Sequence, residues 1–412
     1  MFWKIAWRNI WAKKRQSVLT VALSVFCTVF LIFSFAFMNG QHEKMIQDAV
    51  EIYTGYLMIT GKGHHDHPDY DHLIYDLDEV KKIADGRPEI ENFSERFEAF
   101  ALFAGDEDSV GGKLIGINPE TEQYISRVKR AVTGGEYLDN TDQASCLIGK
   151  KLAKRLDVGL GDKLTYISQA LDFSMAADIL TIKGIFSTGA GIDADSVFIG
   201  KTYMDEIFLS QNMASQVVLL PKKEFRRVKL KRVLSQINED LAASENEALD
   251  WETPLKSMLQ MVNVDSAFGY FSYGILVVVI FFVIMIFSLI SIFQRTKEIG
   301  VLRAVGTKPK QIILMLVGEA FILGTIAVVI GGMIGGWLSY YYYVHPIEFN
   351  VTEEILEQYQ KWGVVDMVFP TVFSYADILT NCLFVLLLNI IAILYPAFKV
   401  TQYKPIDAIN YV

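Results

Sequence analysis

The stretch YFSYGILVVVIFFVIMIFSLISIF, residues 270–293, contains no Asp, Glu, Lys or Arg. An α-helix rises about 1.5 Å per residue, so a helix of this length exceeds the ~30 Å hydrocarbon core of a bilayer. The stretch therefore predicts a membrane-spanning helix. A charged loop, QRTKEIGVLRAVGTKPKQ, occupies residues 294–311, and residues 312–343 are again apolar except for Glu319.

Two further apolar runs, residues 18–38 and 379–398, also lack charged side chains. Of the 412 residues, 52% are hydrophobic and 21% are charged. A soluble domain has a smaller apolar fraction than this, and a purely intramembrane protein has a smaller charged fraction. The four apolar runs therefore predict four membrane spans, and the charged residues must lie in the segments outside them.

The four spans divide the chain into three parts. Residues 1–39 would form an interfacial helix, or merely a basic flank, and the first span. Residues 40–269 would form a large external domain on helical stalks. Residues 270–412 would form three spans, with a cytoplasmic helix at 295–307 and an external loop at 344–377.

The distribution of basic residues predicts the orientation. The segments 1–17, 294–311 and 399–412 hold twelve Lys or Arg residues and two acidic residues. Cytoplasmic loops carry such an excess, so both termini are predicted to lie in the cytoplasm and the large domain outside it. Cys27 and Cys382 lie in predicted spans, which leaves Cys146 without an external disulfide partner.

The external part predicts an α+β fold because short β-rich runs alternate with helical patterns and Gly, Asp or Asn turns. Its length allows two subdomains. The expected stalks are residues 41–52 and 254–267. The expected strands are residues 56–60, 97–103, 113–117, 163–167, 179–186, 196–199 and 216–220. The expected helices are residues 145–156, 201–209 and 222–243.

No nucleotide-binding or catalytic pattern is present. The segment Gly159–Lys163 lacks the spacing of a phosphate-binding loop, and nothing has the spacing of a catalytic triad or paired carboxylates. The histidine-rich tract at residues 64–72 is either a solvated loop or a metal site. The basic run at residues 222–232 is either a solvated helix face or a contact for an acidic partner.

The cytoplasmic loop predicts a short amphipathic helix over residues 296–305. Ile299, Leu302 and Val305 would share one face, and Gly306 would end the helix. Such a helix suits docking in a groove of a cytosolic partner. The alternative is an ordinary basic loop that only sets topology.

The span at residues 312–343 contains two overlapping small-x-x-x-small faces. One face holds Gly331 and Gly335, and the other holds Gly332 and Gly336. This spacing lets another helix approach closely, so we expect the glycines to serve helix packing; the alternative role is ligand binding. Glu319 is the acidic residue of this span. It would act in coupling or proton transfer, or would pair with a loop Arg or Lys.

The order of one span, a large external domain and three spans resembles the FtsX-like permeases of type VII ABC transporters, the MacB and LolC/LolE group. The external segment GGEYL (134–138) is similar to the family's pattern, and KPIDA (404–408) is similar to its terminal signature. The segments GIFSTG (184–189) and GINP (116–119) are most similar to the lipoprotein-releasing branch. The residues that match the family's coupling-helix pattern are Arg295, Glu298, Ile299, Gly300, Leu302, Arg303, Ala304 and Gly306.

This resemblance implies a transport subunit without its own nucleotide site. A partner dimer of cytosolic ATPases would bind ATP and Mg, and a second permease subunit, identical or different, would complete the complex in the bacterial inner membrane. The cargo would be a lipoprotein passed to a periplasmic carrier, with membrane lipids but no nucleic acid as further contacts. Its acyl chains would enter a cavity lined by Phe30, Phe33, Phe37, Phe271 and Ile275.

Two other functions share these features. An efflux pump of the MacB type would move peptides, toxins or antibiotics with an outer-membrane partner. An FtsX-like regulator would control a cell-wall hydrolase. The loop at 344–377 is longer than the lipoprotein-releasing resemblance implies.

Overall fold

The computed structural model describes residues 8, 10–11, 14–105, 108–226, 229–349, 351–352, 355, 358 and 366–402. The chain divides into two compact units. The membrane unit comprises Met1–Lys44, Val262–Phe349 and Val368–Val412, and the external unit comprises Met45–Met261 and Asn350–Met367. The predicted terminal signature at 404–408 and most of the predicted interfacial helix lie outside the described residues.

The described part of the membrane unit contains four helices long and apolar enough to cross a bilayer. They are α2 (Lys14–Ala49), α8 (Lys256–Phe293), α10 (Pro309–Val344) and α12 (Tyr375–Thr401). The prediction of four spans is confirmed. The predicted domain borders at 39/40 and 269/270 fall within α2 and α8, because both helices extend well beyond their apolar runs.

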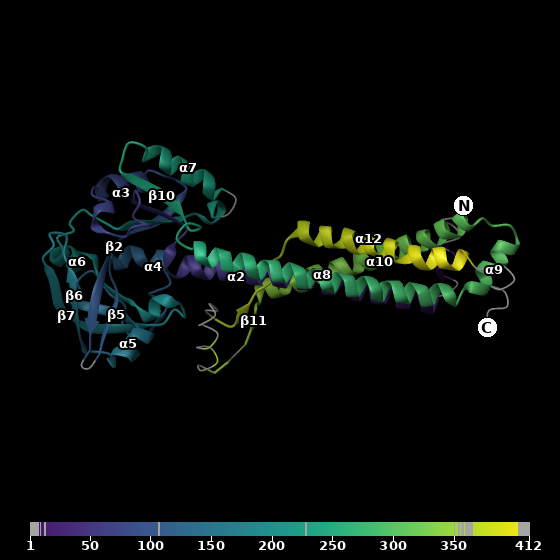
Figure 1. Cartoon of the computed structure of the whole chain (residues 1–412), viewed down its shortest axis with the longest axis horizontal. Coiled ribbons are helices and arrows are strands. Elements are labelled where there is room, and N and C mark those ends of the chain that lie inside the picture. Colours follow the sequence, from purple (N-terminus) through teal and green to yellow (C-terminus); the bar gives the residue numbers. More distant parts are fainter. Residues whose placement is uncertain are drawn as a thin grey trace. The chain divides into compact units, whose positions relative to one another are not determined.

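Helices α2 and α8 lie side by side along the membrane unit (Figure 1). Near one end, Gln16 Nε2 donates to Ser291 Oγ at 2.7 Å. Near the other end, His42 Nε2 lies 3.0 Å from Asp265 Oδ2. The core of the membrane unit is built from aliphatic side chains of several spans. They include Leu31 of α2, Ile280 and Ile284 of α8, and Val385 and Ala392 of α12.

The external segment between α10 and α12 folds back onto the membrane unit. Its described part pairs β11 (Ile347–Glu348) with β12 (Val368–Phe369). Thr371 Oγ1 donates to the Ser339 carbonyl at 2.7 Å, and the Val372 N–H donates to the Ala36 carbonyl at 3.0 Å. These hydrogen bonds hold the returning chain against the end of α10 and the middle of α2.

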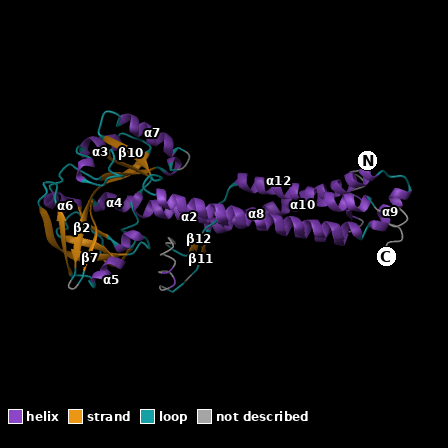
Figure 2. Ribbon diagram, in the orientation of Figure 1, coloured by secondary structure: helices purple, strands orange, loops and turns teal. Residues whose placement is uncertain are grey.

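The described part of the external unit is built on a ten-stranded mixed sheet (Figure 2). The strand order is β10-β1-β9-β2-β3-β8-β5-β7-β4, and β6 pairs with β2 and β7. The strands are β1 (Leu57–Gly61), β2 (Ile90–Ala104), β3 (Ser109–Ile117), β4 (Val132–Gly135), β5 (Ser145–Gly149), β6 (Lys163–Gln169), β7 (Met175–Phe186), β8 (Ser196–Gly200), β9 (Gln216–Pro221) and β10 (Asn246–Asp250).

The long strand β2 joins two hydrophobic cores. Its first half pairs with β9 and its second half pairs with β3. One core includes Leu57, Val217 and Ile237, and another includes Phe103, Leu164 and Ile199. A third cluster includes Ile117, Leu147 and Phe198. Instead of the two subdomains that the length allows, one continuous sheet carries all three cores in the described part of the unit. This arrangement confirms the predicted α+β class.

Five α-helices accompany this sheet in the described part of the unit. They are α3 (Leu77–Asp85), α4 (Pro119–Ile125), α5 (Lys150–Leu156), α6 (Lys201–Phe208) and α7 (Leu230–Asp240). Ser145–Gly149 is a strand and not the start of the predicted helix 145–156, because Cys146, Leu147 and Ile148 are fully buried between β7 and β8. The predictions also missed α3, α4, β4 and β10, and the helix predicted at 222–243 is shorter.

Candidate functional site

A short helix, α9 (Thr296–Ala304), connects α8 to α10. Arg295 precedes it, and Gly306 ends it with a positive φ of 101°. The Gly306 N–H donates to the Arg303 carbonyl, and the Thr307 N–H donates to the Leu302 carbonyl. Glycine adopts this left-handed conformation without the steric cost that a Cβ brings, so Gly306 permits the sharp exit toward α10.

The two sides of α9 have different environments. Ile299 is only 3% exposed and packs in an aliphatic cluster with Ile292, Ile312 and Ile393 from α8, α10 and α12. Val305 is 82% exposed. The prediction that Ile299, Leu302 and Val305 share one docking face is therefore wrong, because Ile299 belongs to the membrane core. The uncovered apolar face, which we call the α9 outer face, consists of Val301, Leu302 and Val305.

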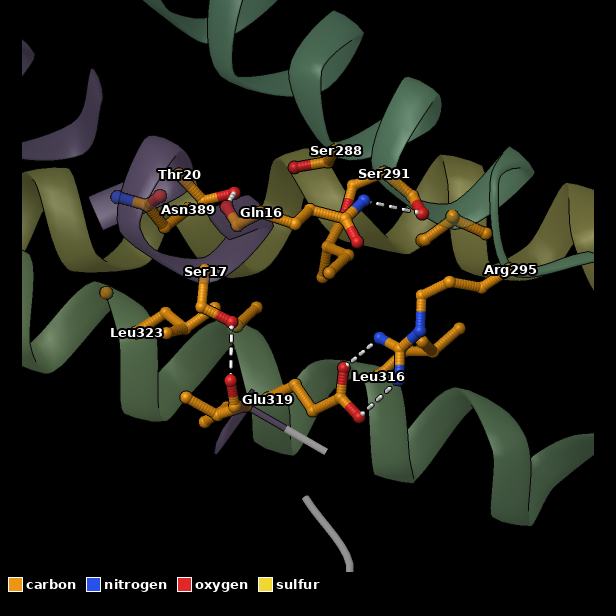
Figure 3. A pocket seen from close by; sticks show the side chains of 15 residues that line it. Gln16, Ser17, Thr20, Ser288, Ser291, Arg295, Leu316, Glu319, Leu323 and Asn389 are labelled. Carbon is orange, nitrogen blue, oxygen red and sulfur yellow. Dashed lines mark hydrogen bonds and ion pairs between the residues drawn. The ribbon is translucent and has the colours of Figure 1, made fainter. Parts of the chain in front are cut away.

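Arg295 and Glu319 form a bidentate ion pair between the start of α9 and α10 (Figure 3). Arg295 Nη1 lies 2.5 Å from Glu319 Oε2, and Arg295 Nη2 lies 3.2 Å from Oε1. The two side chains are only 12% and 8% exposed. Two parallel hydrogen bonds fix the guanidinium in orientation as well as in distance. Of the two roles predicted for Glu319, the structure shows the pairing with a loop arginine.

Arg303 links the other end of α9 to α12. Its Nη1 donates to the Thr401 carbonyl at 2.9 Å, within the last turn of α12. Helix α9 is thus held by the α8 chain before it, by Glu319 of α10 and by Thr401 of α12. Of the residues predicted for ATPase coupling, Arg295, Ile299 and Arg303 contact other helices of the membrane unit and Gly300 is buried, whereas Glu298 and Leu302 are exposed.

Polar side chains from all the spans meet beside the Arg295–Glu319 pair. They surround a cavity of about 50 Å³ (Figure 3). Gln16 reaches Ser291 from α2 to α8, and Ser24 Oγ donates to Asn389 Oδ1 at 3.0 Å from α2 to α12. A cavity of this size can hold water, and buried polar groups inside a membrane mark functional regions. Sequence reasoning missed this cluster because its members are distributed over four apolar runs.

Two family comparisons cover most of the chain. The MacB-like periplasmic core domain family matches residues 17–237, more than half of the chain, and the FtsX-like permease C-terminal family matches residues 270–405. The chain belongs to the FtsX-like, MacB-like permeases of ABC transporters. The family assignment made from the α9 and external motifs is thereby confirmed.

Named relatives of this permease align over almost their full length. The lipoprotein-releasing system transmembrane protein LolC of Xylella fastidiosa strain 9a5c is 22% identical over 96% of this chain and 93% of its own length. LolC of Buchnera aphidicola subsp. Schizaphis graminum is 20% identical over 94% of this chain and 91% of its own.

Solved structures resemble parts of the permease more distantly. The periplasmic region of MacB from Actinobacillus actinomycetemcomitans is 12% identical, covers 53% of this chain and 98% of its own, and has a TM-score of 0.38. The extracellular domain of the transporter YknZ from Gram-positive bacteria is 13% identical, covers 47% and 98%, and has a TM-score of 0.34.

The glycines of α10 place this permease helix against two different neighbours. A Cβ on Gly331 would lie 2.6 Å from the Thr28 Cβ, and one on Gly335 would lie 3.2 Å from Ile32, both on α2. A Cβ on Gly332 would lie 2.8 Å from Cys382 Sγ, and one on Gly336 would lie 3.3 Å from Ile378, both on α12. Each small-x-x-x-small face therefore accommodates one helix.

The five residues predicted to line a cargo cavity have different neighbours among the described residues. Phe33 packs edge-on against Tyr342 of α10, and Phe37 stacks with Phe369. Phe30 stacks with Phe26 on α2. Phe35, not Phe33 or Phe37, contacts α8 through Tyr273. The helical rotation of α2 decides this, because neighbouring residues point about 100° apart.

Phe271 and Ile275 belong to an exposed apolar stripe on α8. Phe271 is 67% exposed and Ile275 is 52% exposed. The stripe, which we call the α8 stripe, recurs at helical spacing along the permease's second span. Its members are Val264, Phe268, Phe271, Ile275, Val278, Phe282 and Ile286.

The GIFSTG segment has a structural role in the external unit. The N–H groups of Thr188 and Gly189 both donate to the buried Asp193 carboxylate at 2.9 Å, and Thr188 Oγ1 donates to it at 2.7 Å. The segment therefore forms a tight turn after β7. This turn explains the motif without assigning it a contact to cargo.

A polar joint anchors the end of α2 within the external unit. Arg127 Nη1 lies 2.7 Å from Asp48 Oδ1, and its Nη2 lies 2.7 Å from Glu51 Oε2. Burial would raise the pKa of Glu51, but hydrogen bonds from Arg127 and other neighbours lower it below its usual value. Arg96 Nη1 donates to the Tyr53 carbonyl at 2.7 Å, and its guanidinium lies 4.0 Å from the Tyr53 ring centroid.

The histidine-rich and basic tracts show structural contacts. His72 Nδ1 lies 2.6 Å from Asp69, and no group of three His, Cys, Asp or Glu residues within the described ranges could hold a metal ion. Arg226 lies 5.1 Å from the Tyr56 ring centroid. Cys27, Cys146 and Cys382 are free thiols.

Proposed function

We propose that this permease converts movements of a separate cytosolic ATPase dimer, which binds ATP and Mg, into movements of the external unit. The observation that carries this proposal is the division of α9 into an anchored inner side and an uncovered apolar outer face. The α9 outer face suits insertion into a partner's groove, whereas the inner side transfers the displacement to the spans.

The anchoring of α9 supports direct transfer of force. Arg295 and Glu319 connect α9 to α10, and Arg303 connects it to the end of α12. A displacement of α9 would therefore move these helices together. The 36 residues of α2 correspond to roughly 54 Å of helix, which exceeds the thickness of the hydrocarbon core.

The contacts of Arg127 and Arg96 with the end of α2, which we call the polar joint, would transmit a movement of α2 to the external unit. Arg127 and Arg96 hold Asp48, Glu51 and Tyr53 at the end of the continuous α2 helix. A rotation or tilt of α2 would reach the sheet through these contacts. The excess of basic residues in segments 1–17 and 294–311 supports an inner-membrane location with both termini in the cytoplasm.

The cargo is a lipoprotein, extracted from the inner membrane and passed to a periplasmic carrier. Two relatives named as LolC proteins of lipoprotein-releasing systems align along nearly the whole chain, which supports this substrate class. The α8 stripe offers a lipid-facing apolar surface for acyl chains beside a second permease subunit, identical or different. Each buried methylene contributes about 0.8 kcal/mol, so an acylated anchor requires such a surface as it leaves the bilayer.

Replacing Leu302 or Val301 with Glu is expected to abolish co-purification with the cognate ATPase, since a charge on the α9 outer face cannot enter an apolar groove. Membrane insertion and the unfolding temperature should remain unchanged because these side chains are exposed. Pull-down of tagged permease from detergent extracts measures the effect. Lys308→Gln, an exposed change in the same loop, is the matched control. Undiminished ATPase binding by Leu302→Glu and Val301→Glu would remove this docking role.

A photoreactive residue at Phe271 or Ile275 is expected to crosslink a triacylated lipoprotein before ATP hydrolysis. ATP and the cognate ATPase should then release the cargo into the soluble fraction. Phe33, which packs against Tyr342, is the matched position at which little cargo should be captured. Capture of phospholipid alone, with no lipoprotein released during turnover, would favour the efflux or regulatory function.

A further inference from the structure

An apolar groove of about 390 Å³ lies where the first turns of α2 meet α10. Its walls are aliphatic and come from both helices: Val18, Val21, Ala22, Leu323 and Ile326. Trp11 and Lys14 stand at its mouth. The groove is lined by residues of α2, α10 and the segment before α2, whereas the proposed cargo surface is the α8 stripe, so the two are distinct.

The mouth of the groove is cationic. Lys14 is exposed, and its Nζ lies 5.4 Å from the Trp11 ring centroid. Residues 1–17 contain five Lys or Arg residues and no acidic residue. The uncharged run begins at Val18, one helical turn after Lys14, so the amine lies at headgroup depth and the aliphatic walls lie within the hydrocarbon core.

We propose that this groove binds one acyl chain of an anionic glycerophospholipid, with its phosphate group held by Lys14. Aliphatic walls match the chain, and a cationic mouth without acidic side chains matches a headgroup of net negative charge. Trp11 supplies the amphipathic ring that is favoured at the membrane interface. The orientation in the proposed function places this lipid in the cytoplasmic leaflet. The proposal that the groove binds a lipid does not depend on that orientation.

The test uses full-length permease in nanodiscs of phosphatidylcholine and phosphatidylglycerol in equal amounts. Native mass spectrometry after gentle release counts the phospholipids that each protein retains. The parent protein should retain phosphatidylglycerol in preference. Lys14→Gln should lower phosphatidylglycerol retention about fivefold, the effect expected of one cation at the membrane surface, and leave phosphatidylcholine retention unchanged.

Two further variants separate the groove from the general basic charge. Ala22→Phe places a ring between the aliphatic walls and should lower the retention of both lipids. Lys310→Gln removes an exposed lysine from the first turn of α10, which is not among the residues that line the groove, and should retain phosphatidylglycerol as the parent does. Unfolding temperatures of the variants confirm that each is folded.

Three results would overturn the proposal. The first is equal retention of the two lipids by the parent, and the second is an equal loss in Lys310→Gln and Lys14→Gln. The third is found with a photoreactive residue placed at Val21, if it crosslinks to a protein helix in place of lipid. Because none of these measurements involves the ATPase or a lipoprotein, failure here would leave the transport function untouched. Loss of ATPase binding in the α9 variants would likewise leave the lipid site untouched.

Discussion

Glu319→Leu is expected to destabilise the membrane unit by up to about 3–5 kcal/mol. It removes the bidentate partner of the Arg295 guanidinium and leaves only the longer contact to the exposed Glu298, at 3.6 Å. Arg295 is 12% exposed, so water in the small adjoining cavity would replace only in part the two hydrogen bonds that Arg295 donates to Glu319. The orientation of α9 should be lost together with the ion pair. We expect a lower unfolding temperature of the full-length permease and loss of its effect on ATPase turnover in the reconstituted complex.

The double variant Arg295→Met/Glu319→Leu separates stability from coupling. Replacing both members of a buried ion pair with apolar residues of similar size is often neutral or stabilising. The double variant should therefore regain the unfolding temperature of the parent but remain uncoupled, because the bidentate link between α9 and α10 is absent. Parental coupling in the double variant would show that the pair serves only stability.

Glu122→Gln is expected to destabilise the external unit by a similar amount. Arg96 and Glu122 are both 0% exposed, and Arg96 donates to Glu122 at 2.6 Å through Nη2 and 3.1 Å through Nε. Burial would lower the pKa of Arg96, but the charge of Glu122 raises it above its usual value, so the guanidinium stays charged. Glutamine keeps the shape of Glu122 and removes its negative charge.

Glu120→Gln is the matched control, because Glu120 is exposed on the same short helix, α4. Thermal unfolding of the full-length permease, followed by limited proteolysis of the external unit, measures both variants. A loss of about 3–5 kcal/mol corresponds to a decrease of roughly 6–20 °C in a unit of this size. A parental unfolding temperature for Glu122→Gln would mean that the surroundings of Arg96 relax to supply another counter-charge or water.

The two ion pairs stand at comparable points of the proposed transmission path. Arg295 and Glu319 fix the helix that would receive the ATPase, and Arg96 holds the carbonyl of Tyr53 where α2 ends. In both ion pairs the cation is an arginine, which can make several directed hydrogen bonds at once. Transmission of a movement requires a rigid connection at these two points. The uncoupled double variant and Glu122→Gln therefore test the first and last steps of one mechanism.

Local properties of the chain were enough to predict the spans, the α+β class and the family. An uncharged run such as 270–293 can satisfy its backbone hydrogen bonds in a bilayer only as a helix, so its structure follows from composition and length. The end of α9 at Gly306 was also predictable, because glycine tolerates a positive φ. The order of the segments and the α9 motif were sufficient for the family assignment.

Sequence periodicity did not reveal which side of each element would be covered. Ser145–Gly149 was expected to be helical, yet burial between β7 and β8 makes it a strand. Ile299, Phe33 and Phe37 were assigned to partner or cargo surfaces. Neighbouring helices cover Ile299, and Tyr342 of α10 and Phe369 of β12 contact the rings of Phe33 and Phe37. A short apolar run or a helical stripe is compatible with several neighbours, and only packing selects one.

The polar site depended entirely on tertiary structure. Arg295 and Glu319 were each noticed, but nothing in their sequence separation identifies them as partners, and Gln16, Ser24 and Asn389 carry no motif. Charged and polar groups removed from water must find complementary groups, and the helices that supply them come from distant parts of the chain. The fold brings Arg295 to Glu319 and Ser24 to Asn389 because close packing of the spans places these groups side by side at the same depth.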